Sequence, residues 1–356
     1  MPTTLPVKLK KSMTFIELLD SLVSSAKPFS LVELSGNLTL DIFSSGVMDR
    51  HFEARYTDHP SGFMSTYREL FHTYTHEQVD LPWYFTPRTE WRCRRLGKRI
   101  RSTLRPVIQE AFQNRQTDSV KSRNITSLSL KDINVLSLEA VDEIVDQLNT
   151  FMFAGHDTTS ILISWMIYEL SRTPQALQAV RDEMDGLFGV DHQPFDVRAK
   201  FLSLGDADCF KRMPYSSAVI KEALRLWPPA GTACMTIPGA GVKVKAPSGE
   251  TYPLDGIQVY NCAIITQRDP AVYGDSANDF VPERWLPEKE EHIEIPVSAW
   301  RAFERGPRNC FGQELATLEA RVVFAILSKH DSMKHDIGEL SIDDGGRPIM
   351  NEHGES

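Results

Sequence analysis

The longest apolar pattern in this 356-residue chain places the strongest constraint on its fold. It runs from about Ser137 to Ser171, and its apolar residues recur at three- and four-residue spacing, which predicts one amphipathic helix. Roughly 35 residues at 1.5 Å each span on the order of 50 Å, enough to cross a whole domain. Thr173-Pro174 is expected to end this helix and begin the next. One face of the long helix carries Val141, Ile144, Val145, Leu148 and Met152.

The rest of the chain also favours helices over strands. We expect helices at 14–26, 31–50, 88–116 and 214–226, and a last one after Gly312, with Pro106 kinking or dividing the third. Alternating apolar and polar residues around Gly and Pro at 240–266 predict short strands. The fold class is therefore mainly α with small β-sheets. We expect a single domain over residues 1–335 and a polar tail over 336–356.

Composition excludes several classes of function. The formal net charge of −9 argues against a dedicated nucleic-acid binder, so we expect no nucleic-acid partner. Five cysteines without a C-x-x-C pair argue against a disulfide framework or a zinc site. The chain contains no uninterrupted apolar run of about 18 residues, so we expect no transmembrane helix. The arginine-rich helix at 88–116 is interpreted as a solvated face, with contact to an anionic membrane surface as the alternative.

The long helix contains an unusual polar stretch, Ala-Gly-His-Asp-Thr-Thr, at residues 154–159. Gly155 costs about 1 kcal/mol relative to alanine inside a helix. Asp157 and Thr158 are poor helix formers whose side chains compete for backbone hydrogen bonds. We therefore expect a local opening of the helix that admits a small ligand or water. The alternative is a tolerated flaw in a surface helix.

Two further motifs lie in the C-terminal half of the chain, and the second contains a cysteine. Glu222 and Arg225 lie three residues apart on one predicted helix face, and Arg284 offers a third partner for a buried ion cluster. Farther on, the chain reads Phe-Glu-Arg-Gly-Pro-Arg-Asn-Cys-Phe-Gly over residues 303–312. The next helix would direct its N-terminus at the Cys310 sulfur and favour a thiolate.

The residues around Cys310 suit a flat anionic group. Gly306 and Gly312 remove side chains, so a bulky planar group could approach the backbone. Arg308 supplies a cation for a carboxylate on that group. A thiolate, a cation for a propionate and a bare backbone surface together indicate a haem site with sulfur as the axial iron ligand.

At this point the sequence resembles the cytochrome P450 family, the haem-thiolate monooxygenases, in the style of its eukaryotic microsomal members, fungal ones included. The resemblance rests on four motifs in the family's order, of which the last is highly specific. They are the oxygen-activation motif at 154–159, Glu222-x-x-Arg225, Pro-Glu-Arg-Trp at 282–285 and the haem loop Phe303-x-x-Gly306-x-Arg308-x-Cys310-x-Gly312.

The resemblance implies roles for individual residues. Cys310 would bind the iron of haem b, Arg308 would pair with a propionate, and Phe303, Gly306 and Gly312 would complete the haem loop. Asp157 and Thr158 would deliver protons to dioxygen. Glu222, Arg225 and Arg284 would form the structural cluster. The substrate pocket would include Phe151, Ala154 and Thr158.

The resemblance also implies partners and location. Electrons would come from NADPH through a flavoprotein reductase, and the substrate would be a lipophilic small molecule, such as a secondary metabolite. The family's location is the cytosolic face of the endoplasmic reticulum, whereas a chain without an anchor would be cytoplasmic. We expect that the family's N-terminal part is lacking here. The chain also departs from the family at Gln267, where a histidine often precedes Arg268.

Two alternatives to a monooxygenase stay open at this stage. One is a non-catalytic or degenerate haem-binding fragment. The other is a haem-thiolate isomerase or dehydratase that needs no external electrons, for which the pair Asp157 and Thr158 would have little use.

Overall fold

A computed structural model describes residues 5–25, 29–48, 62–76, 81–117, 125–190, 196–197, 199–201, 211–286 and 295–327. The predicted tail at 336–356, and the end of the predicted domain beyond residue 327, lie outside these residues. The helices are α1 (Leu5–Ser25), α2 (Leu31–Met48), α3 (Gly62–His76), α4 (Pro87–Thr117), α5 (Ile125–Ser129), α6 (Leu138–Arg172), α7 (Pro174–Phe188), α10 (Pro214–Leu226), α11 (Ala263–Thr266), α12 (Pro270–Tyr273), the 3-10 turn η1 (Pro282–Trp285) and α13 (Gln313–Leu327).

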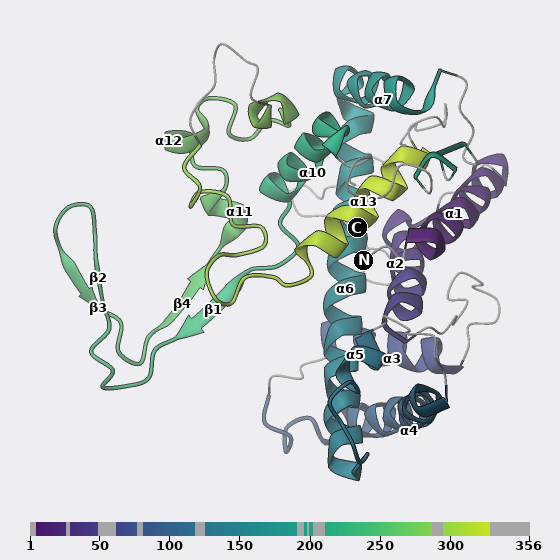
Figure 1. Ribbon diagram of the computed structural model, residues 1–356. Coiled ribbons are helices and arrows are strands. Elements are labelled where there is room, and N and C mark those ends of the chain that lie inside the picture. The colour runs from purple at the N-terminus through teal and green to yellow at the C-terminus, as the bar shows by residue number, and fades with distance from the viewer. Residues whose placement is uncertain are drawn as a thin grey trace.

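The long helix α6 forms the axis of the molecule, with the other long helices packed around it (Figure 1). The Ser137 side chain accepts a hydrogen bond from the Ala140 N–H and caps the first turn. Pro174 begins α7 directly after the Thr173 C-cap. The predicted bounds of α6 are therefore confirmed to within one residue at each end.

Two hydrophobic clusters hold the helices together. One joins α1, α2, the second half of α6, α7, α10 and α13, with Leu38, Leu170 and Ala320 fully buried. The other joins α2, α3, α4 and the first half of α6, with Leu104 and Val145 fully buried. Both clusters draw residues from α2 and from α6, so these two helices connect the halves of the core.

Helix α4 runs unbroken through Pro106. Of the two outcomes predicted for Pro106, a kink or a division of the helix, the division does not occur. The residue is exposed, and on the solvent side the carbonyl freed by proline can bond to water.

The strands form two antiparallel pairs that extend away from the helices (Figure 1). β1 (Thr232–Met235) pairs with β4 (Gln258–Asn261), and β2 (Lys243–Lys245) pairs with β3 (Thr251–Pro253). In the first pair Thr232 lies opposite Asn261, and β1 begins six residues after α10 ends. Among the residues that the structure describes, no helix combines the length and apolar character that a bilayer crossing needs.

Candidate functional site

The polar stretch of α6 remains regular helix throughout residues 151–160. The local opening predicted there is wrong. The Thr158 hydroxyl donates to the Ala154 carbonyl oxygen at 2.7 Å, so it finds a partner without breaking the helix. Ala154 is exposed, and Asp157 and Thr158 are half-buried. Ala154 and Thr158 lie one turn apart on the same face of α6.

Gly155 is explained by its neighbour in α2. A methyl group at this position would lie 2.0 Å from Cε2 of Phe43, because the phenyl ring rests directly on the glycine backbone. Close by, the Thr39 hydroxyl lies 2.8 Å from the carbonyl oxygen of His156. Gly155 therefore lets α2 approach the polar stretch closely. The sequence signalled an exceptional glycine here but not its partner.

Burial sets the protonation of the two ionisable side chains in this stretch. His156 is buried, its Nδ1 lies 2.8 Å from the Met152 carbonyl oxygen, and its ring meets Tyr67 and Phe71 edge-on. Burial lowers the pKa of His156 and raises the pKa of Asp157, which His156 opposes. The Asp157 carboxyl thus keeps its proton to a higher pH than an ordinary aspartate, as a proton donor in this place would need.

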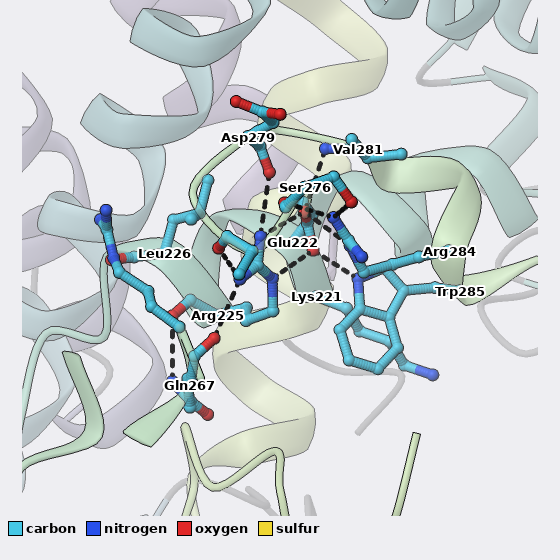
Figure 2. Close-up of polar contacts among 12 residues, drawn as sticks. Lys221, Glu222, Arg225, Leu226, Gln267, Ser276, Asp279, Val281, Arg284 and Trp285 are labelled. Atoms are coloured by element: carbon cyan, nitrogen blue, oxygen red, sulfur yellow. Dashed lines mark hydrogen bonds and ion pairs between the residues drawn. The ribbon is translucent and has the colours of Figure 1, made fainter. Parts of the chain in front are cut away.

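Glu222 lies at the centre of an ion cluster in which it and Arg225 are fully buried, shown in Figure 2. Arg225 donates to both carboxylate oxygens, with Nε 2.9 Å from Oε2 and Nη2 2.8 Å from Oε1. Arg284 donates from Nε to Oε1 at 3.0 Å. The structure therefore brings together all three charged residues singled out in the sequence. It adds two donors that sequence reasoning missed, the Val281 N–H and the Trp285 indole N–H, although Trp285 is adjacent to Arg284 in the same motif.

Arg225 also binds the loops that follow α10 in the sequence and precede the Cys310 segment. Its Nη1 donates to the carbonyl oxygens of Gln267 and Ala277, and its Nη2 donates to that of Asp279 (Figure 2). A buried guanidinium that satisfies a carboxylate and three carbonyls fixes α10 to the following loops. The cluster is thus a structural centre beside the cysteine segment.

The loop around Cys310 is folded back on itself. The Cys310 N–H donates to the Phe303 carbonyl oxygen at 2.8 Å, and the Asn309 N–H donates to that of Gly306. Gly306 has a φ of 84°, a left-handed conformation that favours glycine. Cys310 is exposed, and α13 begins at Gln313, three residues later. The loop therefore presents its sulfur outward near a helix N-terminus.

These residues fit a haem. A methyl group on Gly306 would meet nothing within 4 Å, so the backbone there is open to a flat ligand, and one on Gly312 would lie 3.7 Å from the Cys310 sulfur. Arg308 is exposed, and within the described residues it forms no ion pair. Phe303 is half-buried and packs against Trp300, with ring centroids 5.9 Å apart.

The cysteine loop and the polar stretch of α6 meet through two phenylalanines. The Phe151 ring approaches the Phe311 ring edge-on, with centroids 5.2 Å apart. Phe311 follows Cys310, and Phe151 precedes Ala154 by one helical turn, so the contact joins the two parts of the site. Phe311 was not singled out in the sequence, because an aromatic residue next to the cysteine carries no signal of its partner.

Comparisons with known proteins agree with this geometry. A family model described as "Cytochrome P450" matches residues 4–338. A crystal structure of a cytochrome P450 superposes with a TM-score of 0.72 at 19% identity, covering 92% of this chain and 71% of that one, which shows the fold.

Curated fungal relatives are similar over large parts of the chain. A cytochrome P450 monooxygenase from Polytolypa hystricis is 33% identical over 213 residues, which are 56% of this chain and 35% of that protein. A bifunctional cytochrome P450/NADPH–P450 reductase from Gibberella moniliformis is 29% identical over 87% of this chain and 26% of its own length. A cytochrome P450 monooxygenase from Aspergillus aculeatus is 26% identical, covering 91% of this chain and 67% of that one. The chain thus spans about a third or less of the first two relatives. The family model matches this chain over nearly the chain's whole length, and the buried Glu222 cluster lies beside an exposed cysteine loop. The chain therefore belongs to the cytochrome P450 family.

Proposed function

We propose that this chain is a haem-thiolate monooxygenase that inserts one oxygen atom of O2 into a lipophilic small molecule. The second oxygen atom would leave as water, with two electrons supplied by NADPH. The observation that carries the proposal is the exposed Cys310 sulfur, on a loop that contacts the polar stretch of α6. The relatives named as monooxygenases support it.

Each predicted site residue has a place in this proposal. Cys310 would bind the iron, and the haem would supply the oxygen chemistry. Arg308 would pair with a propionate, while the loop glycines leave the backbone open to the porphyrin. Asp157 would hold a proton that the Thr158 hydroxyl passes on. Phe151 and Ala154 would line the substrate side, with Thr158.

A flavoprotein NADPH reductase is the proposed electron donor. Several relatives are named as bifunctional proteins that join a cytochrome P450 to an NADPH–P450 reductase, which supports this class of partner. For the substrate we propose a lipophilic secondary metabolite, because the site residues Phe151 and Ala154 offer an apolar surface beside Thr158.

We further propose attachment to the cytosolic face of the endoplasmic reticulum. Trp83, Tyr84 and Phe85 are 60–66% exposed just before the arginine-rich helix α4. Exposed aromatic rings next to basic side chains suit an anionic lipid surface. Co-sedimentation with phosphatidylserine vesicles should fall when these three residues are replaced by serine. Equal sedimentation of the triple variant would contradict this proposal.

The carbon monoxide difference spectrum of the reduced, haem-loaded protein tests the proposed function. We expect the red-shifted band of a thiolate-ligated haem, and its loss in Cys310→Ser with haem still bound. Absence of the band in fully loaded protein would refute the proposal. With a reductase and NADPH, Thr158→Ala should divert reducing equivalents from product to peroxide. An isomerase or dehydratase would consume no NADPH and would not respond to this change.

A further inference from the structure

One non-glycine residue in the cysteine loop has a strained backbone. Glu304 has a φ of 53°, and it is the only described residue other than glycine with a positive φ. A side chain in this left-handed region costs energy, so it persists only where surrounding contacts determine it. The strain therefore points to the contacts that the Glu304 side chain makes.

The Glu304 carboxylate fastens the loop to the end of the β1–β4 pair. Oε1 accepts from the Asn261 side chain at 2.7 Å, and Oε2 accepts from Nε and Nη2 of Arg301 at 2.9 and 2.6 Å. Asn261 belongs to β4 and lies opposite Thr232 of β1 in the strand register. Hydrogen bonds to an ionised acceptor are the stronger ones. The carboxylate thus joins β4 of this pair and Arg301 at one point.

Gln267 fastens the same segment to α10. Its side chain is fully buried, and Nε2 donates to the carbonyl oxygens of Leu224 and Arg225 at 3.2 Å each. Its Oε1 accepts from the Arg301 N–H at 2.7 Å. The amide therefore satisfies carbonyls in the last turn of α10, where intrahelical donors run out, and at the same time fixes the Arg301 backbone.

These contacts reach the cysteine through one backbone hydrogen bond. Glu304 follows Phe303, whose carbonyl oxygen accepts from the Cys310 N–H at 2.8 Å. The φ of Glu304 turns the peptide group that contains this carbonyl, so holding Glu304 aims the acceptor at Cys310. Gln267 holds the chain two residues before Phe303.

We propose that Gln267 and Glu304 are positioning residues for Cys310, acting as a two-point clasp on the loop. Gln267 attaches the loop to α10, and Glu304 attaches it to the β1–β4 pair. The clasp transmits the order of the buried Glu222 cluster to the sulfur, because Arg225 of that cluster donates to the Gln267 carbonyl. The inference rests on the proposed haem ligation by Cys310, but its geometry is a property of the chain itself.

Hydrogen exchange tests the clasp without haem. In Gln267→Met and Glu304→Ala, peptides that contain the Cys310 amide should exchange at least about tenfold faster than in the wild type, since lost hydrogen bonds raise the population of open loop. The control is Ile108→Ala. Ile108 is fully buried in the hydrophobic cluster that joins α2, α3, α4 and the first half of α6. This variant should leave these peptides unchanged. Wild-type exchange rates in both clasp variants would overturn the inference.

The haem-loaded protein gives the second measurement. Both clasp variants should convert part of the red-shifted carbon monoxide band to the band of a non-thiolate haem, whereas Ile108→Ala should not. Gln267→His should restore the wild-type spectrum, because a neutral imidazole can accept from Arg301 and donate to α10. Full retention of the thiolate band in Gln267→Met and Glu304→Ala would also overturn the clasp. If wild-type protein lacks that band while exchange responds as expected, the proposed haem ligation fails and the clasp stands.

Discussion

Replacing Gly155 with alanine is expected to destabilise the protein, although alanine is the better helix former. In an open helix this change would stabilise by about 1 kcal/mol. Here the new methyl carbon would lie 2.0, 2.4 and 2.5 Å from three ring atoms of Phe43. Carbon atoms pack at ~3.5–4.0 Å, so the ring or the helix must shift by more than an ångström. Overpacking a core costs about 1–3 kcal/mol, and a clash this close belongs near the upper end, for a net loss of about 2 kcal/mol.

Urea unfolding followed by circular dichroism measures this loss. Gly97→Ala is the matched control, because a methyl group at Gly97 within α4 would meet nothing within 4 Å. That change should stabilise by about 1 kcal/mol. Phe43→Leu should weaken the clash, so the double variant with Gly155→Ala should lose less than the sum of the single losses. If Gly155→Ala stabilises the protein as Gly97→Ala does, the close contact of α2 with α6 is refuted.

Four further variants test the buried charges. Arg225→Leu should cost roughly 3–5 kcal/mol of unfolding free energy in urea titrations, since it strips Glu222 of its bidentate partner; a loss under 1 kcal/mol would contradict the cluster's role. Lys8 Nζ lies 3.6 Å from Oε2 of Glu319, and each side chain is 2% exposed. Lys8→Met alone should lower the free energy of unfolding, whereas Lys8→Met/Glu319→Leu should change it little. Equal losses in the single and double variants would exclude that coupling. Burial raises the pKa of Glu319 to about 7, against the opposing charge of Lys8, so between about pH 4.5 and 7 the folded state binds more protons than the unfolded state. The unfolding free energy should therefore fall as pH rises from about 4.5 to 7. In Glu319→Gln the urea midpoint should change less with pH over this window.

The sequence predicted the elements whose signals are local. The bounds of α6 followed from apolar periodicity, a capping serine and a Thr-Pro end, all of which act within a few residues. The meeting of Glu222 with Arg284, 62 residues apart, was predicted through motif order rather than through any local rule. Periodicity therefore predicted α2, α4, α6 and α10, but it missed α3 and placed the start of α1 at residue 14 instead of Leu5. The motif order predicted that Glu222 and Arg284 meet.

What the sequence could not predict depended on docking. Gly155 was recognised as exceptional, but the opening inferred from it was wrong, because the space it provides is taken by Phe43 from a helix more than a hundred residues earlier. Gln267 stood out as a departure from the family, yet its three hydrogen bonds depend on how α10 and Arg301 come together. The strain at Glu304 is a backbone property with no signature in residue type.

The polar stretch of α6 lies where the two hydrophobic clusters meet. One cluster ends on α6 at Met152 and the other begins at Leu162. In between, α2 is attached to α6 through Phe43 on Gly155 and Thr39 on His156. A body that tilts is displaced least at the point where it is held. Any tilting of one half of the core against the other would therefore pivot at the residues proposed to move protons, and would displace them least.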